Sequence, residues 1–563
     1  MVNVIKNEDT ENRSRYGLIS MIAIVIGTVI GSGIYVKNSS LYETTNSAIY
    51  VTIGWIIGGL IVISMFIAFI EIMSITTKKN EQGTFANWGR HLWGEKTSKY
   101  IGIYFIFFYF PFVISVETIF SSNYLNNLTF GDASTNVVGS FFFITFFAFI
   151  FLIFTYFLNI FFLKTSRVMQ VTGTVIKTIP LFAVIFLMII IVAGVIVGDS
   201  STATNEIFNP DDPINSNHKG VASIFLIIPA ILFTLDGFLF SASISKEAKK
   251  PQTFKNAAII AIIFIIIIYT LFSLSSLYLG GYDSTDSSGF AIEGVINNIF
   301  SDNVASVLVT VTDVILIISI LVATFGYVVS ATYSLSDASN FDDIKDEKGL
   351  YLRRSVDGVP YNAGMKLLTI SFLFVFIMRF FDGTALIFID DKVEATGYIG
   401  MSDFASNLFT ITNFFIYSIL ILGAFRNRWT KKIETDKVRG FFVFSIISMV
   451  LVWLVVITSI YQIFDSFFDP NVEIYKTVYH ILIIVLFVLL IIIISEKIIK
   501  KSETLTKKQI KYKQNFKNAY DQHLELNHYL RKNNIKIKVD KKYYGEKINS
   551  SINKWKNWFK KKK

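Results

Sequence analysis

The sequence contains no cysteine and few charged side chains. Among its 563 residues are no Cys, 5 His and 17% charged residues, whereas 53% are hydrophobic. The lack of Cys excludes disulfides, thiol catalysis and Cys-ligated zinc or iron–sulfur sites. With only five scattered His, we expect no metal site and no cofactor. A soluble globular chain carries about 25% charged residues, so this composition indicates a membrane protein.

Long apolar runs, such as residues 257–272 and 481–495, separate the clusters of charge. A run of about 20 apolar residues is long enough to span a bilayer, and a helix satisfies its own backbone hydrogen bonds there. We therefore predict an all-α integral membrane protein. Its twelve transmembrane helices are predicted at 17–37, 47–74, 99–123, 137–163, 170–198, 221–245, 256–280, 304–336, 364–381, 404–425, 440–463 and 476–498.

The basic residues alternate between the connections of these twelve spans. If the N-terminus is cytoplasmic, 46 of the 52 Lys and Arg residues fall in cytoplasmic segments. Basic residues gather on the cytoplasmic side of membrane proteins. We predict a multi-pass protein of the cell membrane with both termini cytoplasmic, divided into an N-terminal segment (1–16), a domain of twelve transmembrane helices (17–500) and a basic tail (501–563).

The basic character of the chain belongs to this tail. From Lys497 onward there are 21 Lys and Arg against 5 Asp and Glu, and the last ten residues interleave lysines with Trp555, Trp558 and Phe559. Such a segment suits the anionic inner leaflet of a membrane. We expect lipid contact or disorder there, and no nucleic-acid binding.

The first span contains three glycines within seven residues, Gly27, Gly31 and Gly33. Gly27 and Gly31 have the spacing of a close helix–helix contact. The alternative interpretation is a broken helix, because each glycine costs about 1 kcal/mol relative to alanine. Unwinding at 31–33 would expose backbone N–H groups that bind a carboxylate.

The sixth span contains a carboxylate beside a glycine, Asp236 and Gly237. A charge inside the membrane faces protein or water, so Asp236 is either a buried structural partner or part of a site. Interruptions in the first and sixth spans, five spans apart, are typical of an inverted repeat of five plus five helices. The last two spans would then follow the repeat.

Four motifs, in order along residues 15–430, resemble those of the amino acid–polyamine–organocation superfamily of permeases. They are the Gly-Ser-Gly-Ile-Tyr element (31–35), residues 68–71 with 83–86, the Lys-Thr-Ile-Pro-Leu element (177–181), and residues 233–238 with Glu247 and 249–251. The sequence departs from the family in lacking an Arg in 330–337 and in its long tail.

The resemblance implies that an amino acid binds between the two broken helices. Its carboxylate would meet the backbone near Ser32 and Gly33, and its ammonium the carbonyls near Phe233 and Thr234, with Phe233 as an aromatic gate. The substrate-binding residues expected on this basis are Ile30, Gly31, Ser32, Gly33, Phe233, Thr234, Asp236 and Gly237.

Five basic residues are assigned to outer segments: Lys37, Lys219, Arg379, Lys392 and Lys476. On this assignment Lys177 is the only basic residue inside a span. Its long stem could carry the ammonium toward water. Our hypothesis is instead that Lys177 takes the place of a coupling cation and, by losing its proton when desolvated, links transport to protons.

Other ionisable residues also lie within predicted spans. Glu117 and Asp313 are candidates for the transport pathway, and Glu71 is either part of an inner gate or solvated at the interface. His480, near an outer end, is predicted to be structural.

The predicted function is secondary active transport of amino acids by alternating access. The sequence has no Gly-x-x-x-x-Gly-Lys-Ser/Thr phosphate loop and no nucleophile–base pair that can be placed at membrane depth, so we expect no enzyme. A carrier of polyamines or other organic cations, for which Asp236 and Glu117 would supply charge, and an amino acid exchanger remain alternatives. A membrane nutrient sensor that signals through its tail is a third.

Overall fold

The computed structural model describes residues 18–78, 83–130, 136–193, 207–216, 218–240, 251–280, 291–353, 359–389, 398–465 and 474–503. Within these ranges the regular structure is entirely helical, as predicted. The predicted N-terminal segment (1–16), nearly all of the basic tail (501–563) and the element at Glu247 lie outside the described residues.

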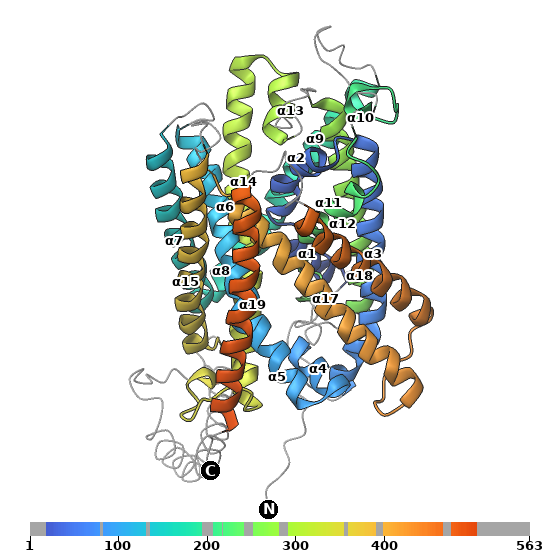
Figure 1. Cartoon of the computed structure of the whole chain (residues 1–563), viewed down its shortest axis with the longest axis vertical. Coiled ribbons are helices and arrows are strands. Elements are labelled where there is room, and N and C mark those ends of the chain that lie inside the picture. The colour runs from blue at the N-terminus through green and yellow to red at the C-terminus, as the bar shows by residue number, and fades with distance from the viewer. Residues whose placement is uncertain are drawn as a thin grey trace, which may run out of the picture.

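Figure 1 shows the helices in one elongated bundle, with α10 and α13 at one end and α4 and α5 at the other. The helices are α1 (Leu18–Val29), α2 (Gly33–Thr45), α3 (Ala48–Lys78), α4 (Phe85–Trp93), α5 (Glu95–Tyr104), α6 (Phe110–Phe130), α7 (Val137–Phe161), α8 (Leu163–Ile176), α9 (Ile179–Val192), α10 (Pro213–Ser216), α11 (Ser223–Leu235), α12 (Pro251–Leu279), α13 (Ile292–Ile299), α14 (Asp302–Asn340), α15 (Tyr361–Ala385), α17 (Gly400–Thr430), α18 (Phe441–Asp465) and α19 (Ile474–Glu503). A π-helical turn, η1 (Phe105–Tyr109), joins α5 to α6, and short 3₁₀ turns occur at η4 (Leu350–Leu352) and η5 (Leu386–Phe388).

Ten stretches of the described residues are long and apolar enough to cross a membrane. They coincide with ten of the predicted spans: the second to fifth and the seventh to twelfth. The first and sixth predicted spans appear as short helices, α1 with α2 and α11, because each is interrupted. A multi-pass membrane protein is therefore confirmed, whereas the details of a twelve-helix repeat stay a prediction.

Two prolines explain interruptions in other helices. Pro180 has no N–H to donate to the carbonyl of Ile176, four residues earlier, and α8 ends there before α9 begins at Ile179. Pro111 cannot close the usual bond to Phe107, and the π-helical turn η1 directly precedes it. Single π-turns of this kind are frequent at functional sites.

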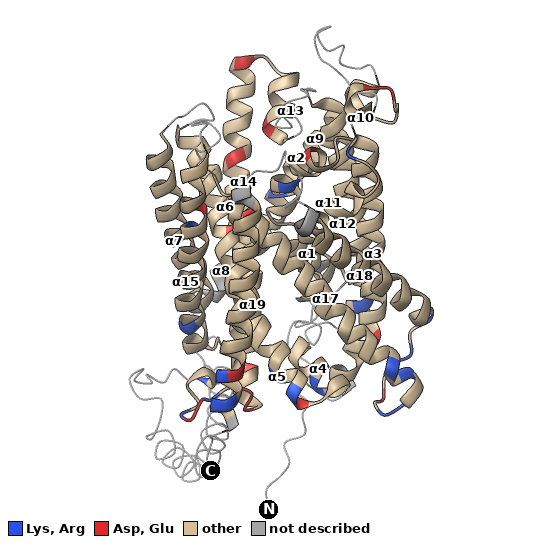
Figure 2. Cartoon of the chain, in the orientation of Figure 1, with Lys and Arg blue, Asp and Glu red and all other residues tan. Residues whose placement is uncertain are grey.

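The helices pack in two groups. In one, α1 packs on α12, and α11 packs on α2 and α3. In the other, α6 packs on α7, α14 and α15, and α17 contacts helices of both groups. Figure 2 shows that most charged residues lie near the helix ends, many of them at the end of α4 and α5, and few lie at mid-bundle. The few charged residues at mid-bundle need partners that stabilise them, because a charge away from water is costly.

Candidate functional site

Both predicted helix breaks are present. Helix α1 ends at Val29 and α2 begins at Gly33, so Ile30, Gly31 and Ser32 connect the two half-helices. Helix α11 ends at Leu235, where Asp236 is extended, and Gly237 follows with φ +96°. The first N–H groups of a helix have no partner within the helix, so each break leaves backbone polar groups available at mid-bundle.

The two breaks touch through glycines. A Cβ placed on Gly33 would lie 2.7 Å from the Thr234 Cα, and one on Gly237 would lie 2.8 Å from the Thr28 carbonyl oxygen. Both distances are shorter than real side chains allow. Glycine is therefore required at both positions for the backbones to approach this closely.

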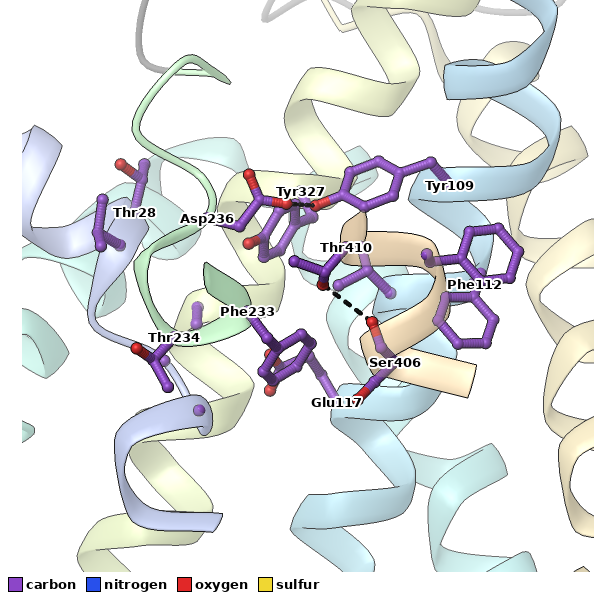
Figure 3. Close-up of a pocket in the computed structure, with 16 residues that line it drawn as sticks. Thr28, Tyr109, Phe112, Glu117, Phe233, Thr234, Asp236, Tyr327, Ser406 and Thr410 are labelled. Atoms are coloured by element: carbon purple, nitrogen blue, oxygen red, sulfur yellow. Dashed lines mark hydrogen bonds between the residues drawn. The ribbon is translucent and has the colours of Figure 1, made fainter. Parts of the chain in front are cut away.

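A small cavity of about 10 Å³ lies between the breaks, and Figure 3 shows side chains from both groups of helices around it. A cavity of this size holds roughly one water molecule. Among the predicted site residues, those that line it are Gly31, Gly33, Phe233, Thr234, Asp236 and Glu117. Lining residues that sequence reasoning missed include Tyr109, Phe112, Tyr327, Ser406, Phe409 and Thr410.

Lys177 is fully buried between α8 and α9 and points at the first break. Its Nζ donates to the carbonyl oxygens of Gly27, at 2.6 Å, and of Ile30. Its own carbonyl accepts from the Tyr35 hydroxyl at 2.6 Å. An ammonium at this place meets the negative end of the α1 dipole, so the side chain does not extend toward water.

Asp236 is 3% exposed, and its carboxylate is held by donors from two other helical segments, η1 and α17. It accepts from the hydroxyl of Tyr109 at 2.6 Å, from Asn413 at 3.1 Å and from the hydroxyl of Tyr417 at 3.3 Å. The Gly237 N–H donates to it at 2.8 Å. Tyr109 belongs to η1, so the π-helical turn before Pro111 aims this hydroxyl at the second break.

Lys37 corrects one sequence prediction. Lys177 is not the only basic residue inside the helical bundle: Lys37 and Arg379, which were assigned to outer segments, are 1% and 2% exposed. The Lys37 Nζ donates to Asp403 at 2.5 Å and to the hydroxyl of Ser406 at 2.8 Å, and lies 5.1 Å from the centre of the Phe233 ring. This contact ties α2 to α17 over the cavity.

Comparison with known proteins identifies the family. The family model described as "Amino acid permease" matches residues 16–493. The chain belongs to the amino acid permease family. It is therefore a membrane protein that carries amino acids by secondary transport, and the expected resemblance is confirmed.

Individual relatives of this permease are distant. It is 23% identical over 517 residues to an uncharacterised protein of Mycoplasma pneumoniae, covering 83% of this chain and 86% of the relative. It is 26% identical over 248 residues to the serine/threonine exchanger SteT of Bacillus subtilis, covering 44% of this chain and 50% of SteT. A solved manganese transporter of Eremococcus coleocola shares the fold, with a TM-score of 0.51, 13% identity, and coverage of 87% of the permease and 95% of that chain.

Aromatic rings separate the cavity of the permease from the end formed by α4 and α5. The ring of Phe240 lies 5.5 Å from Tyr109, 5.5 Å from Phe85 and 5.1 Å from Phe110, between ring centres. On the other side of these rings is a second cavity of about 30 Å³, which Phe240 and Asp337 line. Tyr109 lines the first cavity and Phe85 and Phe110 line the second, so this aromatic plug lies between the two cavities.

Two further carboxylates of the permease lie away from the cavity. Glu71 is fully buried, pairs with Arg428 at 2.6 Å and accepts from the Val438 N–H at 3.2 Å, so it fastens the segment between α17 and α18 to α3. It is neither solvated nor in the aromatic plug. Asp313 is 4% exposed in α14 and does not line either cavity.

His480, a predicted intramembrane residue, and the buried Arg379 both lie against aromatic rings. The His480 ring stacks on Phe404 at 3.7 Å, as a structural residue would. Arg379 pairs with Asp382 at 3.1 Å and lies over the ring of Phe141. Within the described ranges, no group of three His, Asp or Glu side chains could hold a metal ion.

Proposed function

We propose that this permease binds a single amino acid between the two helix breaks and moves it together with a proton. The observation that supports the binding mode is the cavity itself, which lies between the start of α2 and the end of α11. The substrate carboxylate would accept from the N–H groups of Ser32 and Gly33 at the positive end of α2. Its ammonium would meet the carbonyls of Phe233 and Thr234 at the end of α11.

The closed cavity suggests how access alternates. The cavity has room for about one water molecule and is too small for an amino acid, and we infer that this conformation is occluded on both sides. The Lys37 contact to Asp403, together with Phe233, closes one side, and the rings around Phe240 close the other. Opening one side at a time would expose the substrate to one side of the membrane and then to the other.

Lys177 supports the proton coupling. Its ammonium occupies the end of α1, where backbone carbonyls would otherwise coordinate a metal cation in an ion-coupled carrier. A resident ammonium removes the need for such a cation and is itself able to exchange a proton. We therefore assign the coupling cation's place to Lys177.

Alternatives differ in what they require of the site. The exchanger SteT is a relative over part of the chain, and obligatory exchange would need substrate on both sides. A carrier of organic cations would need a carboxylate that faces the substrate. Asp236 already accepts three side-chain hydrogen bonds, whereas Glu117 also lines the cavity, so competition by putrescine separates this alternative from the permease. A nutrient sensor would bind the amino acid without moving it across the membrane.

We favour a permease that is not an enzyme, with both termini cytoplasmic and the tail (501–563) on anionic lipid.

Uptake by the purified protein in liposomes tests this proposal. We expect one chemical class of labelled amino acid to accumulate, and an inward proton gradient to increase its accumulation. Uptake only into liposomes preloaded with amino acid would indicate an exchanger. Saturable binding with no flux would indicate a sensor, and uptake competed by putrescine but not by amino acids would indicate an organic-cation carrier.

A further inference from the structure

The second cavity, beyond the aromatic plug, carries polar groups that the proposed binding mode does not use. Its volume of about 30 Å³ gives room for roughly two water molecules. Four phenylalanine rings line it, together with the polar side chains of Thr84, Ser330, Ser334, Asp337 and Asp343. Hydroxyl and carboxylate oxygens accept hydrogen bonds from an ammonium group, and aromatic faces attract its charge. The lining therefore suits an ammonium ion.

One face of α14 connects the two cavities. Ala323 and Tyr327 line the first cavity, and Ser330, Ser334 and Asp337 line the second. Their spacing of four, three, four and three residues puts all five on one face of the helix. Tyr327 and Asp337 are ten residues apart, so this face extends about 15 Å between them. A molecule that leaves the first cavity past the rings therefore meets the polar part of this face.

The segment after the second break also reaches both cavities. Asp236 lines the first cavity, and Phe240, four residues later, lines the second. The π-helical turn η1 is divided in the same way, with Tyr109 at the first cavity and Phe105 at the second. The ring of Phe240 lies 5.5 Å from that of Tyr109 and 6.4 Å from that of Phe105, between ring centres. A movement of these rings would join the two cavities.

The hydroxyls of Ser330 and Ser334 are available to a ligand. Thr324 and Thr332, in the same helix, each donate at 2.7 Å to a backbone carbonyl three or four residues earlier. Within the described part of the chain, Ser330 and Ser334 form no such bond and no other hydrogen bond. A helical serine hydroxyl that does not bond to its own backbone is left to another partner, and here both serines line the cavity.

The two carboxylates of this cavity have different partners. Asp343 pairs with Arg90 at 2.6 Å. Asp337 accepts from the side-chain amide of Asn87 at 3.0 Å and from the hydroxyl of Thr84 at 3.5 Å, so the start of α4 closes over it. Of the two, Asp337 lies on the connecting face of α14, and it is the carboxylate that a cation moving along this face would meet.

We propose that the second cavity is a release site, in which the departing amino acid places its ammonium against Asp337 and the hydroxyls of Ser330 and Ser334. The class of ligand is a primary ammonium on an apolar stem, whose carbon atoms contact the rings. The cavity has room for the ammonium group, and the plug and the start of α4 move to admit the rest of the molecule.

The release site binds the substrate more weakly than the first cavity does. Both charged groups of the amino acid are bound in the proposed binding mode, whereas only the ammonium is bound in the release site. The substrate therefore passes through the release site and leaves at the end formed by α4 and α5, which the proposed topology makes cytoplasmic. This inference rests on the proposed function.

The first test separates the ammonium of the substrate from its carboxylate. The probes are 2-phenylethylamine, which has no carboxylate, and 3-phenylpropionate, which has no ammonium. Each is titrated by calorimetry into the full-length protein in detergent, saturated with the amino acid that it transports. We expect the amine to bind and the acid not to bind. Asp337→Asn, which keeps an acceptor for Asn87, should weaken amine binding at least about tenfold. Glu347→Gln, a carboxylate that pairs with Lys345 near the same end, should leave it unchanged.

Transport measurements distinguish the substrate from a free amine as the natural ligand. In liposomes with uniformly oriented protein, KM is measured for labelled amino acid supplied on the side of α4 and α5 and on the opposite side. We expect Asp337→Asn to raise KM about tenfold on the first side and to leave it within about twofold on the other. Equal changes on both sides would indicate a structural role and overturn the proposal. Amine binding that requires Asp337, with KM unchanged on both sides, would mean a site for a free amine and would also overturn it.

A second variant keeps the proposal testable if Asp337→Asn does not fold. The double variant Ser330→Ala, Ser334→Ala should weaken amine binding and raise KM on the side of α4 and α5 only. Amine affinity equal to that of wild type in this variant would overturn the proposal. If the wild-type protein transports an amino acid but does not bind the amine, the release site alone fails. If it transports no amino acid, the proposed function fails.

Discussion

Replacing Gly237 with alanine probes the contact between the two broken helices. Gly237 has φ +96°, a conformation that costs an alanine about 1–2 kcal/mol. The added Cβ would also lie 2.8 Å from the Thr28 carbonyl oxygen and 3.2 Å from the Tyr327 hydroxyl. The first of these atoms is backbone and cannot turn aside, so overpacking adds about 1–3 kcal/mol. The expected loss of stability is about 2–5 kcal/mol.

Gly94 provides a matched control for backbone strain. It has the same φ of +96°, but nothing lies within 4 Å of a Cβ placed on it. Gly94→Ala should therefore show only the conformational cost, about 1–3 kcal/mol for a residue with φ +96° and ψ 174°. Thermal unfolding in detergent, followed by tryptophan fluorescence, compares the two variants. We expect Gly237→Ala to unfold at a clearly lower temperature than Gly94→Ala and to lose transport. Equal unfolding temperatures would refute the close approach of α1 to Gly237.

Three other substitutions have defined outcomes. Lys177→Ala removes the donor to two α1 carbonyls and should abolish the dependence of uptake on the pH gradient; accumulation with undiminished dependence would contradict the assigned role. Glu71→Gln leaves Arg428 without its counter-charge and should lower the free energy of unfolding by about 3–5 kcal/mol. Thermal unfolding measures this loss, and the substrate affinity of the folded variant should be unchanged. Tyr109→Phe removes one of the donors to Asp236 and should lower the free energy of unfolding by about 1–3 kcal/mol. It should also weaken substrate binding in a direct binding assay. Unchanged stability and affinity would show that this hydrogen bond is unimportant.

The helix breaks could be predicted because their causes are local. Three glycines near Gly31 and the pair Asp236–Gly237 weaken a helix wherever the chain folds, and α1 and α11 end close to them. Apolar runs likewise predicted ten spans that the structure contains. In each case the relevant interactions are within a few residues along the chain, which is the range over which a sequence pattern carries information.

The buried charges could not be predicted because their partners are distant in sequence. Lys37 was placed in an outer segment, but Asp403, 366 residues away, allows it to be buried. Glu71 is compensated by Arg428, 357 residues away. A count of basic residues by segment treats each charge separately, so it cannot show that two charges neutralise each other across the bundle.

The cavity residues that the sequence did not predict also depend on contacts that are distant along the chain. Tyr109 lies among the aromatic residues of an ordinary apolar span, and only its place in η1 turns its hydroxyl toward Asp236. Pro111 was a local signal for an irregular turn. It did not, however, show which side chain the turn would aim at the cavity.

A structure of the permease with its amino acid bound tests the central claim most directly. The substrate to use is the amino acid that accumulates in liposomes, and the protein is the full-length chain in a lipid nanodisc. The account predicts density between the breaks, with the substrate carboxylate at Ser32 and Gly33 and its ammonium at Phe233 and Thr234. Density for the amino acid only in the second cavity, beside Asp337 and beyond the ring of Phe240, would contradict it.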